Sequence, residues 1–177
     1  MAVDLKQRYR VLWPRSLIRE IAVANILSAL LPPGYRVLIV GLGAGLADEV
    51  EGWHRGLEDA FDLMVARVEE RGVKPAAFID VTGVHSDEEM VKTVEDGRGL
   101  CIGAWKLWKA ERYGVLDRTW FCHVTANRVA LRWLPAARAH GRRVNLVKGE
   151  KPYICIPARE WSDTRTFIRW LKTIEVG

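Results

Sequence analysis

One stretch, residues 61–83, most limits the folds open to this chain. It reads Phe-Asp-Leu-Met-Val-Ala-Arg, then a charged turn at residues 69–74, then Pro-Ala-Ala-Phe-Ile-Asp-Val-Thr-Gly. Apolar and β-branched runs on either side of a turn that contains glycine are typical of paired strands. We therefore predict an antiparallel β-hairpin in this stretch.

Each strand of the predicted hairpin carries one aspartate, Asp62 in the first and Asp80 in the second. If the turn centres on Arg71 and Gly72, Asp62 faces a position between Asp80 and Thr82. Side chains alternate between the two faces of a strand, so a small change of register decides whether both carboxylates share a face. Directly opposed positions would bring their Cβ atoms within about 5 Å.

Two carboxylates that close repel each other, and one of them would stay protonated near neutral pH. A divalent cation between them removes this repulsion, and hard cations such as Mg²⁺ favour carboxylate oxygens. Asp80 also lies in the apolar run Phe-Ile-Asp-Val, and a buried aspartate needs a partner. We therefore predict a metal site at Asp62 and Asp80, against the alternative that both are solvated residues at a sheet edge.

The other elements follow from apolar periodicity and from cap and turn residues. Residues 1–14 are read as a mobile arm or an early strand. The first helix is expected to begin near Pro14 to Ser16 and to end at Pro32, with Glu20 at the edge of its buried face. That face is formed by Leu17, Ile21, Ala24, Leu27 and Leu31.

Further helices are predicted at 86–95, 105–113, just after Pro135, and from a cap at Ser162 or Asp163 onward. Strands are predicted at 35–40, 100–103, 119–125, 128–134, 142–147 and 153–156, in addition to the hairpin. Irregular alternation of helices and strand pairs favours an α/β fold, with a mixed β-sheet core flanked by helices on both faces. The 177 residues suit a single domain, 1–177, with a core at 15–134 and C-terminal strands and a helix at 142–175.

The net charge of +5 permits a polyanionic partner such as DNA. The apolar runs are too short to span a bilayer, and the N-terminus lacks the apolar core of a signal peptide, so we expect a cytoplasmic protein without membrane contact.

Three scattered cysteines, Cys101, Cys122 and Cys155, predict reduced, buried thiols. Few amides beside many ionic residues indicate a thermophilic source.

The order of these elements resembles the PD-(D/E)XK superfamily, the restriction-endonuclease-like nucleases that include archaeal Holliday-junction resolvases. The residues that carry the resemblance are Glu20 on the first helix, Asp62 on the second strand, and Ile-Asp-Val-Thr-Gly at 79–83 on the third. The family places an acid at the start of the second strand and an acid-x-Lys triplet on the third. The resemblance covers residues 15 to about 134.

By this resemblance, Asp62 and Asp80 would be catalytic ligands of Mg²⁺ (or Mn²⁺), and Glu20 would bind the metal through water. The sequence departs from the family at Thr82, which stands where the family has its lysine. Some members supply this lysine from the following helix, where Lys106 is the first candidate and Lys109 the second.

The implied activity is that of a metal-dependent DNA endonuclease hydrolysing phosphodiester bonds, and a homodimer is plausible by analogy with resolvases. Two alternatives stay open. One is a catalytically inactive nuclease-fold DNA-binding protein, because of Thr82. The other is a Rossmann-like nucleotide- or S-adenosylmethionine-binding protein that uses Gly41–Gly45, although Asp80 lies about 35 residues beyond Gly45 and the expected acid only about 20.

Overall fold

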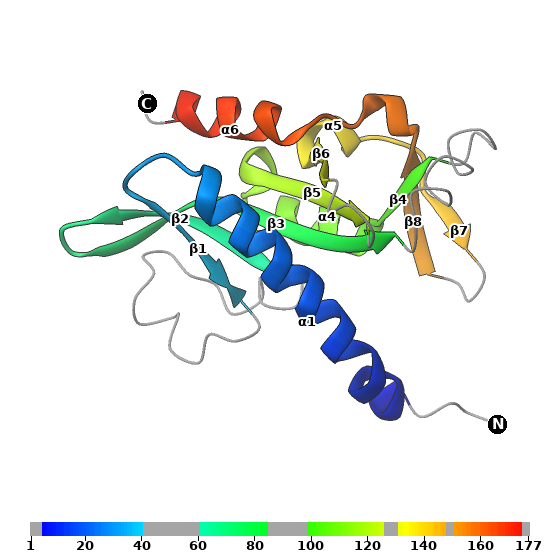
Figure 1. The fold of residues 1–177 in the computed structure, drawn as a ribbon. Coiled ribbons are helices and arrows are strands. Elements are labelled where there is room, and N and C mark those ends of the chain that lie inside the picture. The colour runs from blue at the N-terminus through cyan, green and yellow to red at the C-terminus, as the bar shows by residue number, and fades with distance from the viewer. Residues whose placement is uncertain (1–4, 41–60, 85–98, 126–130, 148–150, 175–177) are drawn as a thin grey trace.

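A computed structural model gives the fold and describes residues 5–40, 61–84, 99–125, 131–147 and 151–174. Helices and the strands of two sheets alternate irregularly along the chain (Figure 1). The helices are α1 (Leu5–Leu30), α4 (Ala104–Arg112), α5 (Ala136–Ala139) and α6 (Thr164–Thr173), with short 3₁₀ turns η3 (Leu116–Arg118) and η4 (Ala158–Glu160). The strands are β1 (Tyr35–Ile39), β2 (Leu63–Glu69), β3 (Gly72–Val84), β4 (Leu100–Gly103), β5 (Thr119–Thr125), β6 (Leu131–Pro135), β7 (Asn145–Val147) and β8 (Lys151–Ile156).

The main sheet has five strands in the order β1-β2-β3-β5-β6. Its neighbouring strands are antiparallel except for the central pair β3 and β5, which run parallel. A smaller sheet has the order β4-β8-β7, and it lies at the end of the main sheet toward which β3 points (Figure 1). The predicted mixed sheet is therefore confirmed.

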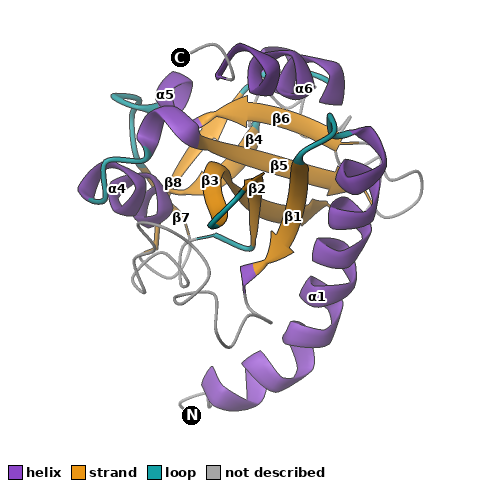
Figure 2. Ribbon diagram, turned by 90° about the vertical axis from the view of Figure 1, so that its left-hand side faces the viewer, coloured by secondary structure: helices purple, strands orange, loops and turns teal. Residues whose placement is uncertain are grey.

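Helices cover both faces of the main sheet, as predicted (Figure 2). On one face, α1 and α6 pack on apolar side chains from β2, β3, β5 and β6, and the ring of Phe167 on α6 stacks on Trp133 with centroids 4.4 Å apart. On the other face, α4, α5 and the small sheet pack around Phe121 and Leu134. The central strands are thus buried on both sides, which explains their near-continuous apolar sequence.

The first helix differs from its prediction at its start and on its buried face. Helix α1 begins at Leu5 and runs through Pro14, so the expected arm or strand is wrong from Leu5 onward. Ile21, predicted to be buried, is 38% exposed. The buried residues of the helix are instead spaced at i, i+3, i+4 and i+7, which defines one helical face: Glu20, Val23, Ala24 and Leu27. Glu20 therefore lies on the buried stripe itself and not at its edge.

The hairpin forms as predicted, but its register differs. Glu69 pairs with Gly72, so the turn lies at Glu70 and Arg71. A β-bulge follows, because the two residues Val65 and Ala66 pair with Ala77 and Pro75, which leaves an extra residue on β3. The predicted register is wrong because the turn lies one residue earlier than expected, and after the bulge the pairing differs from the prediction by one residue.

Two other expectations need correction. Cys101 and Cys155 face each other across β4 and β8 and form a disulfide, so only Cys122 remains a buried free thiol. Strand β1 pairs antiparallel with β2, whereas a Rossmann nucleotide unit needs parallel strands, so that alternative is wrong. The segment Gly41–Gly45, the predicted helix at 86–95 and the turn at Ala126-Asn127 lie outside the described residues.

Within the part of the chain that the structure describes, no helix is both long and apolar enough to cross a membrane.

Candidate active site

The carboxylates of the two hairpin aspartates meet where β2 begins and β3 approaches its end. Asp62 directly precedes β2, and its Oδ2 accepts a hydrogen bond of 2.7 Å from the backbone N–H of Val81. Asp80 is only 1% exposed, and its Oδ2 accepts a hydrogen bond of 3.3 Å from the hydroxyl of Thr82. Both carboxylates are therefore oriented by donors from the same strand.

Helix α4 brings a lysine to this pair. It follows directly on β4, and its apolar side Ala104, Leu107 and Ala110 is buried, which fixes the helix against the sheet. Its Lys106 donates from Nζ to Oδ1 of Asp80, and the Lys106 side chain is 19% exposed. The structure thus places Lys106, the first of the two candidates for the missing lysine, on Asp80.

Helix α1 adds a third acid. Glu20 is 7% exposed and heads the buried stripe of the helix. It is close enough to raise the pKa of Asp62 and of Lys106. We call Glu20, Asp62, Asp80 and Lys106 the carboxylate cluster. Its members lie up to 86 residues apart in the sequence, and the fold brings them together.

Burial and like charge disturb the ionisation of this cluster. The pKa of Asp62 rises from 3.8 to about 7, first because of burial and then because of Asp80, while Lys106 and the Val81 N–H oppose the rise. Burial alone would lower the pKa of Lys106, but Asp80 and Asp62 outweigh it and raise the pKa above 10.5. Lys106 is therefore charged near neutral pH, whereas the Asp62 carboxylate is half protonated.

The cluster suits a divalent cation. Three carboxylates face a single lysine, and their repulsion is what a second, doubly charged cation would relieve. Mg²⁺ keeps several waters and is commonly bound by one or two carboxylates together with substrate phosphates. Among the described residues no group of three His, Cys, Asp or Glu side chains is arranged to hold a metal ion. Asp62 and Asp80 are the two carboxylates that would hold one here.

Two neighbours of the cluster were missed from the sequence. The guanidinium of Arg19 lies against Gly83, in the space that a Cβ added at Gly83 would need. His123 pairs with Thr82 across β3 and β5 and is 4% exposed, and burial lowers its pKa to about 4. Arg19 could have been found from its position next to Glu20 in the sequence. His123 could have been found because it lies in the apolar sequence of its strand.

Comparison with known proteins identifies the family and the fold of the chain. The sequence profile of the Viral/Archaeal nuclease family matches residues 30–166. No curated protein sequence matches the chain. Among solved structures, a nuclease from a fusselovirus superposes with a TM-score of 0.59 at 17% identity, over 99% of this chain and 96% of that one. Archaeoglobus fulgidus Hjc, a Holliday junction resolvase from an archaeal hyperthermophile, gives a TM-score of 0.46 at 11% identity, over 88% and 96%.

The profile covers more than half of the chain, including β2, β3 and α4 with Asp62, Asp80 and Lys106. The overlay on the fusselovirus nuclease shows the same fold over nearly the whole length of both chains. The chain therefore belongs to the Viral/Archaeal nuclease family and has the restriction-endonuclease-like fold that its sequence resembles.

Proposed function

We propose that this nuclease-family chain is a metal-dependent DNA endonuclease that hydrolyses phosphodiester bonds at the carboxylate cluster. One observation carries the proposal: two aspartates from neighbouring strands and a lysine from α4 converge at one place. Asp62 and Asp80 would hold Mg²⁺ (or Mn²⁺), and Glu20 would contribute through water. When bound, the metal polarises the phosphate and lowers the pKa of a coordinated water.

The protein groups take distinct roles in this proposal. The Val81 N–H and the Thr82 hydroxyl hold the two carboxylates in a fixed orientation. Lys106 is charged at neutral pH because the carboxylates raise its pKa, so it would offset negative charge that develops on the phosphate. It would not serve as a proton acceptor in this state. In this proposal Lys106 takes the role of the family's lysine, whose position on β3 is occupied here by Thr82.

We further propose DNA as the partner, since the net charge of +5 favours a polyanion. We also propose a homodimer, by fold analogy, and a single domain over residues 1–177, from the length of the chain. The scarce amides favour a thermophilic source, and the resemblance to archaeal resolvases favours an archaeal one. We also propose a cytoplasmic location. The Cys101–Cys155 disulfide is compatible with that location, because intracellular proteins of hyperthermophiles are often disulfide-rich.

The test is a cleavage assay at elevated temperature on linear, branched and single-stranded DNA, with and without Mg²⁺ or Mn²⁺. Asp80→Asn should abolish cleavage, whereas Asp117→Asn, an exposed aspartate on η3, should cleave like the parent. Cleavage by Asp80→Asn at the parental rate would refute the assignment. Salt-sensitive DNA binding without any cleavage would favour the inactive DNA-binding alternative that Thr82 suggests.

A further inference from the structure

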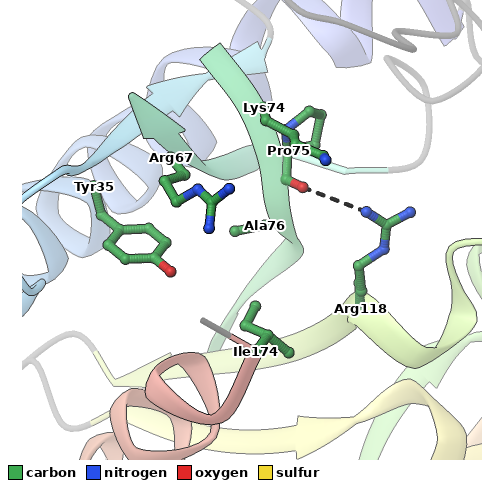
Figure 3. A pocket seen from close by; sticks show the side chains of 7 residues that line it. All are labelled: Tyr35, Arg67, Lys74, Pro75, Ala76, Arg118 and Ile174. Carbon is green, nitrogen blue, oxygen red and sulfur yellow. Dashed lines mark hydrogen bonds between the residues drawn. The ribbon is translucent and has the colours of Figure 1, made fainter. Parts of the chain in front are cut away.

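A group of positively charged side chains lies away from the carboxylate cluster. A cavity of about 210 Å³ opens beside the first half of β3, and we call it the basic cavity. Its walls combine three cationic side chains, a tyrosine and apolar groups (Figure 3), among them Tyr35, Arg67, Lys74, Ala76, Arg118 and Ile174.

The basic cavity is separate from the carboxylate cluster. Pro75 in its wall and Asp80 are five residues apart on β3, which corresponds to roughly 16 Å along a strand. Ala76 belongs to the core beneath α1 and α6, whereas Asp80 contacts Lys106 of α4 on the opposite face. A ligand in the cavity would therefore not touch the carboxylates.

The cationic side chains come from three different elements. Arg67 on β2 pairs with the exposed Glu69 at 2.6 Å, and Arg67 and Lys74 both lower the pKa of Glu69. Arg118 on η3 donates from Nη1 to the carbonyl oxygen of Pro75 at 3.4 Å, which holds its guanidinium beside the cavity (Figure 3). Among the described residues that line the cavity, three are cationic and none is acidic, and the carboxylate of Glu69 adjoins Arg67.

The shape and chemistry of the walls select the ligand. Guanidinium groups match phosphate oxygens with planar pairs of N–H donors, and lysine adds a point charge. The Nε and Nη2 of Arg67 donate to Glu69, so a phosphate bound there would take the place of this carboxylate. The cavity is smaller than the roughly 300–1,000 Å³ of pockets that enclose a drug-sized ligand, yet it holds several waters at about 30 Å³ each. This room suits a phosphate group and not a whole nucleotide.

We propose that the basic cavity binds a phosphate group, held by Arg67, Lys74 and Arg118 with the Tyr35 ring as one wall. The phosphate belongs either to a DNA strand or to a small phosphate ester, because the recognising chemistry is the same. The proposal stands on the cavity alone and does not depend on cleavage at the carboxylate cluster.

The first test is calorimetric titration with inorganic phosphate, at constant ionic strength maintained with chloride. The wild-type protein should bind phosphate, and Arg118→Met or Arg67→Met should weaken this binding about tenfold or more, since each loses a charge-assisted contact. Lys74→Met is a third cavity variant, and it should fold normally because Lys74 is exposed. Arg165→Met, an exposed arginine on α6, is the control and should bind like the wild type.

Absence of phosphate binding to the wild type at millimolar concentration would overturn the proposal. So would equal binding by the wild type and the three cavity variants. Loss of phosphate binding together with intact metal-dependent cleavage would reject this inference alone. Phosphate binding without any cleavage would reject only the proposed endonuclease.

A second titration identifies the source of the phosphate. It measures DNA binding against salt concentration in Asp80→Asn, with and without the additional change Lys74→Met. If the cavity holds a DNA phosphate, Lys74→Met should reduce the slope of log affinity against log salt by about 1. An unchanged slope with lost phosphate binding would assign the cavity to a small phosphate ester.

Discussion

Asp62→Asn should stabilise the metal-free protein at alkaline pH and do little at acid pH. The folded-state pKa of Asp62 is about 7, against 3.8 for an unperturbed aspartate. Because the folded-state value is the higher one, the stability that this group contributes is fully present below pH 3.8 and is lost as the pH rises to about 7. Asparagine keeps the oxygen that accepts from Val81 and removes the charge.

The magnitude follows from the size of the shift. A rise from 3.8 to about 7 corresponds to about 4 kcal/mol at roughly 1.4 kcal/mol per pH unit. The difference in unfolding free energy between Asp62→Asn and the wild type should therefore grow in favour of the variant, by an amount of this order, between pH 4 and pH 8. Groups that titrate alike in both proteins cancel from this difference.

The assay is urea unfolding of both proteins at several pH values, with a chelator present. Asp163→Asn is the matched control, because the Asp163 side chain accepts from the Thr166 N–H at the start of α6 and its pKa is lowered. Its effect should have the opposite sign, with stability lost from the wild type as the pH falls below 3.8. A stability difference for Asp62→Asn that does not change with pH would refute the reasoning.

Three further predictions follow. Lys106→Met should destabilise the metal-free protein by about 3 kcal/mol in the unfolding assay, because it leaves the buried Asp80 carboxylate without its cation. Lys109→Met should destabilise the protein less. The reverse order would move the role of the lysine one turn along α4. Reduction of the disulfide between Cys101 and Cys155, which closes a loop of 54 residues, should lower the unfolding free energy by up to about 4 kcal/mol, and an unchanged Tm on reduction would contradict this. His123 should show no NMR titration between pH 5.5 and 8, because burial lowers its pKa to about 4; a midpoint near 6.5 would show that the ring is accessible.

The sequence was sufficient for the hairpin of β2 and β3, because local rules govern it. Alternating apolar runs and a glycine turn predict β2 and β3, and an aspartate within a buried apolar run predicts a partner for Asp80. The register was not predictable, since neither the exact position of the turn nor the bulge at Val65 and Ala66 has a clear local signal. Contacts between residues far apart in the sequence determine this register.

The remaining differences also have tertiary causes. The buried face of α1 depends on how the helix crosses the sheet, which exposes Ile21 and buries Glu20. The pairing of Cys101 with Cys155 depends on β4 and β8 becoming neighbours, although the two cysteines are 54 residues apart. The choice of Lys106 over Lys109 likewise depends on the buried side of α4.

The most direct test of the central claim is calorimetric titration of Mn²⁺ into the wild type, Asp62→Asn, Asp80→Asn and Asp117→Asn at pH 8. If Asp62 and Asp80 form the metal site, the wild type and Asp117→Asn bind the ion alike, and the two other variants lose this binding. Equal binding by all four proteins, or none by the wild type, would contradict a metal site at the carboxylate cluster.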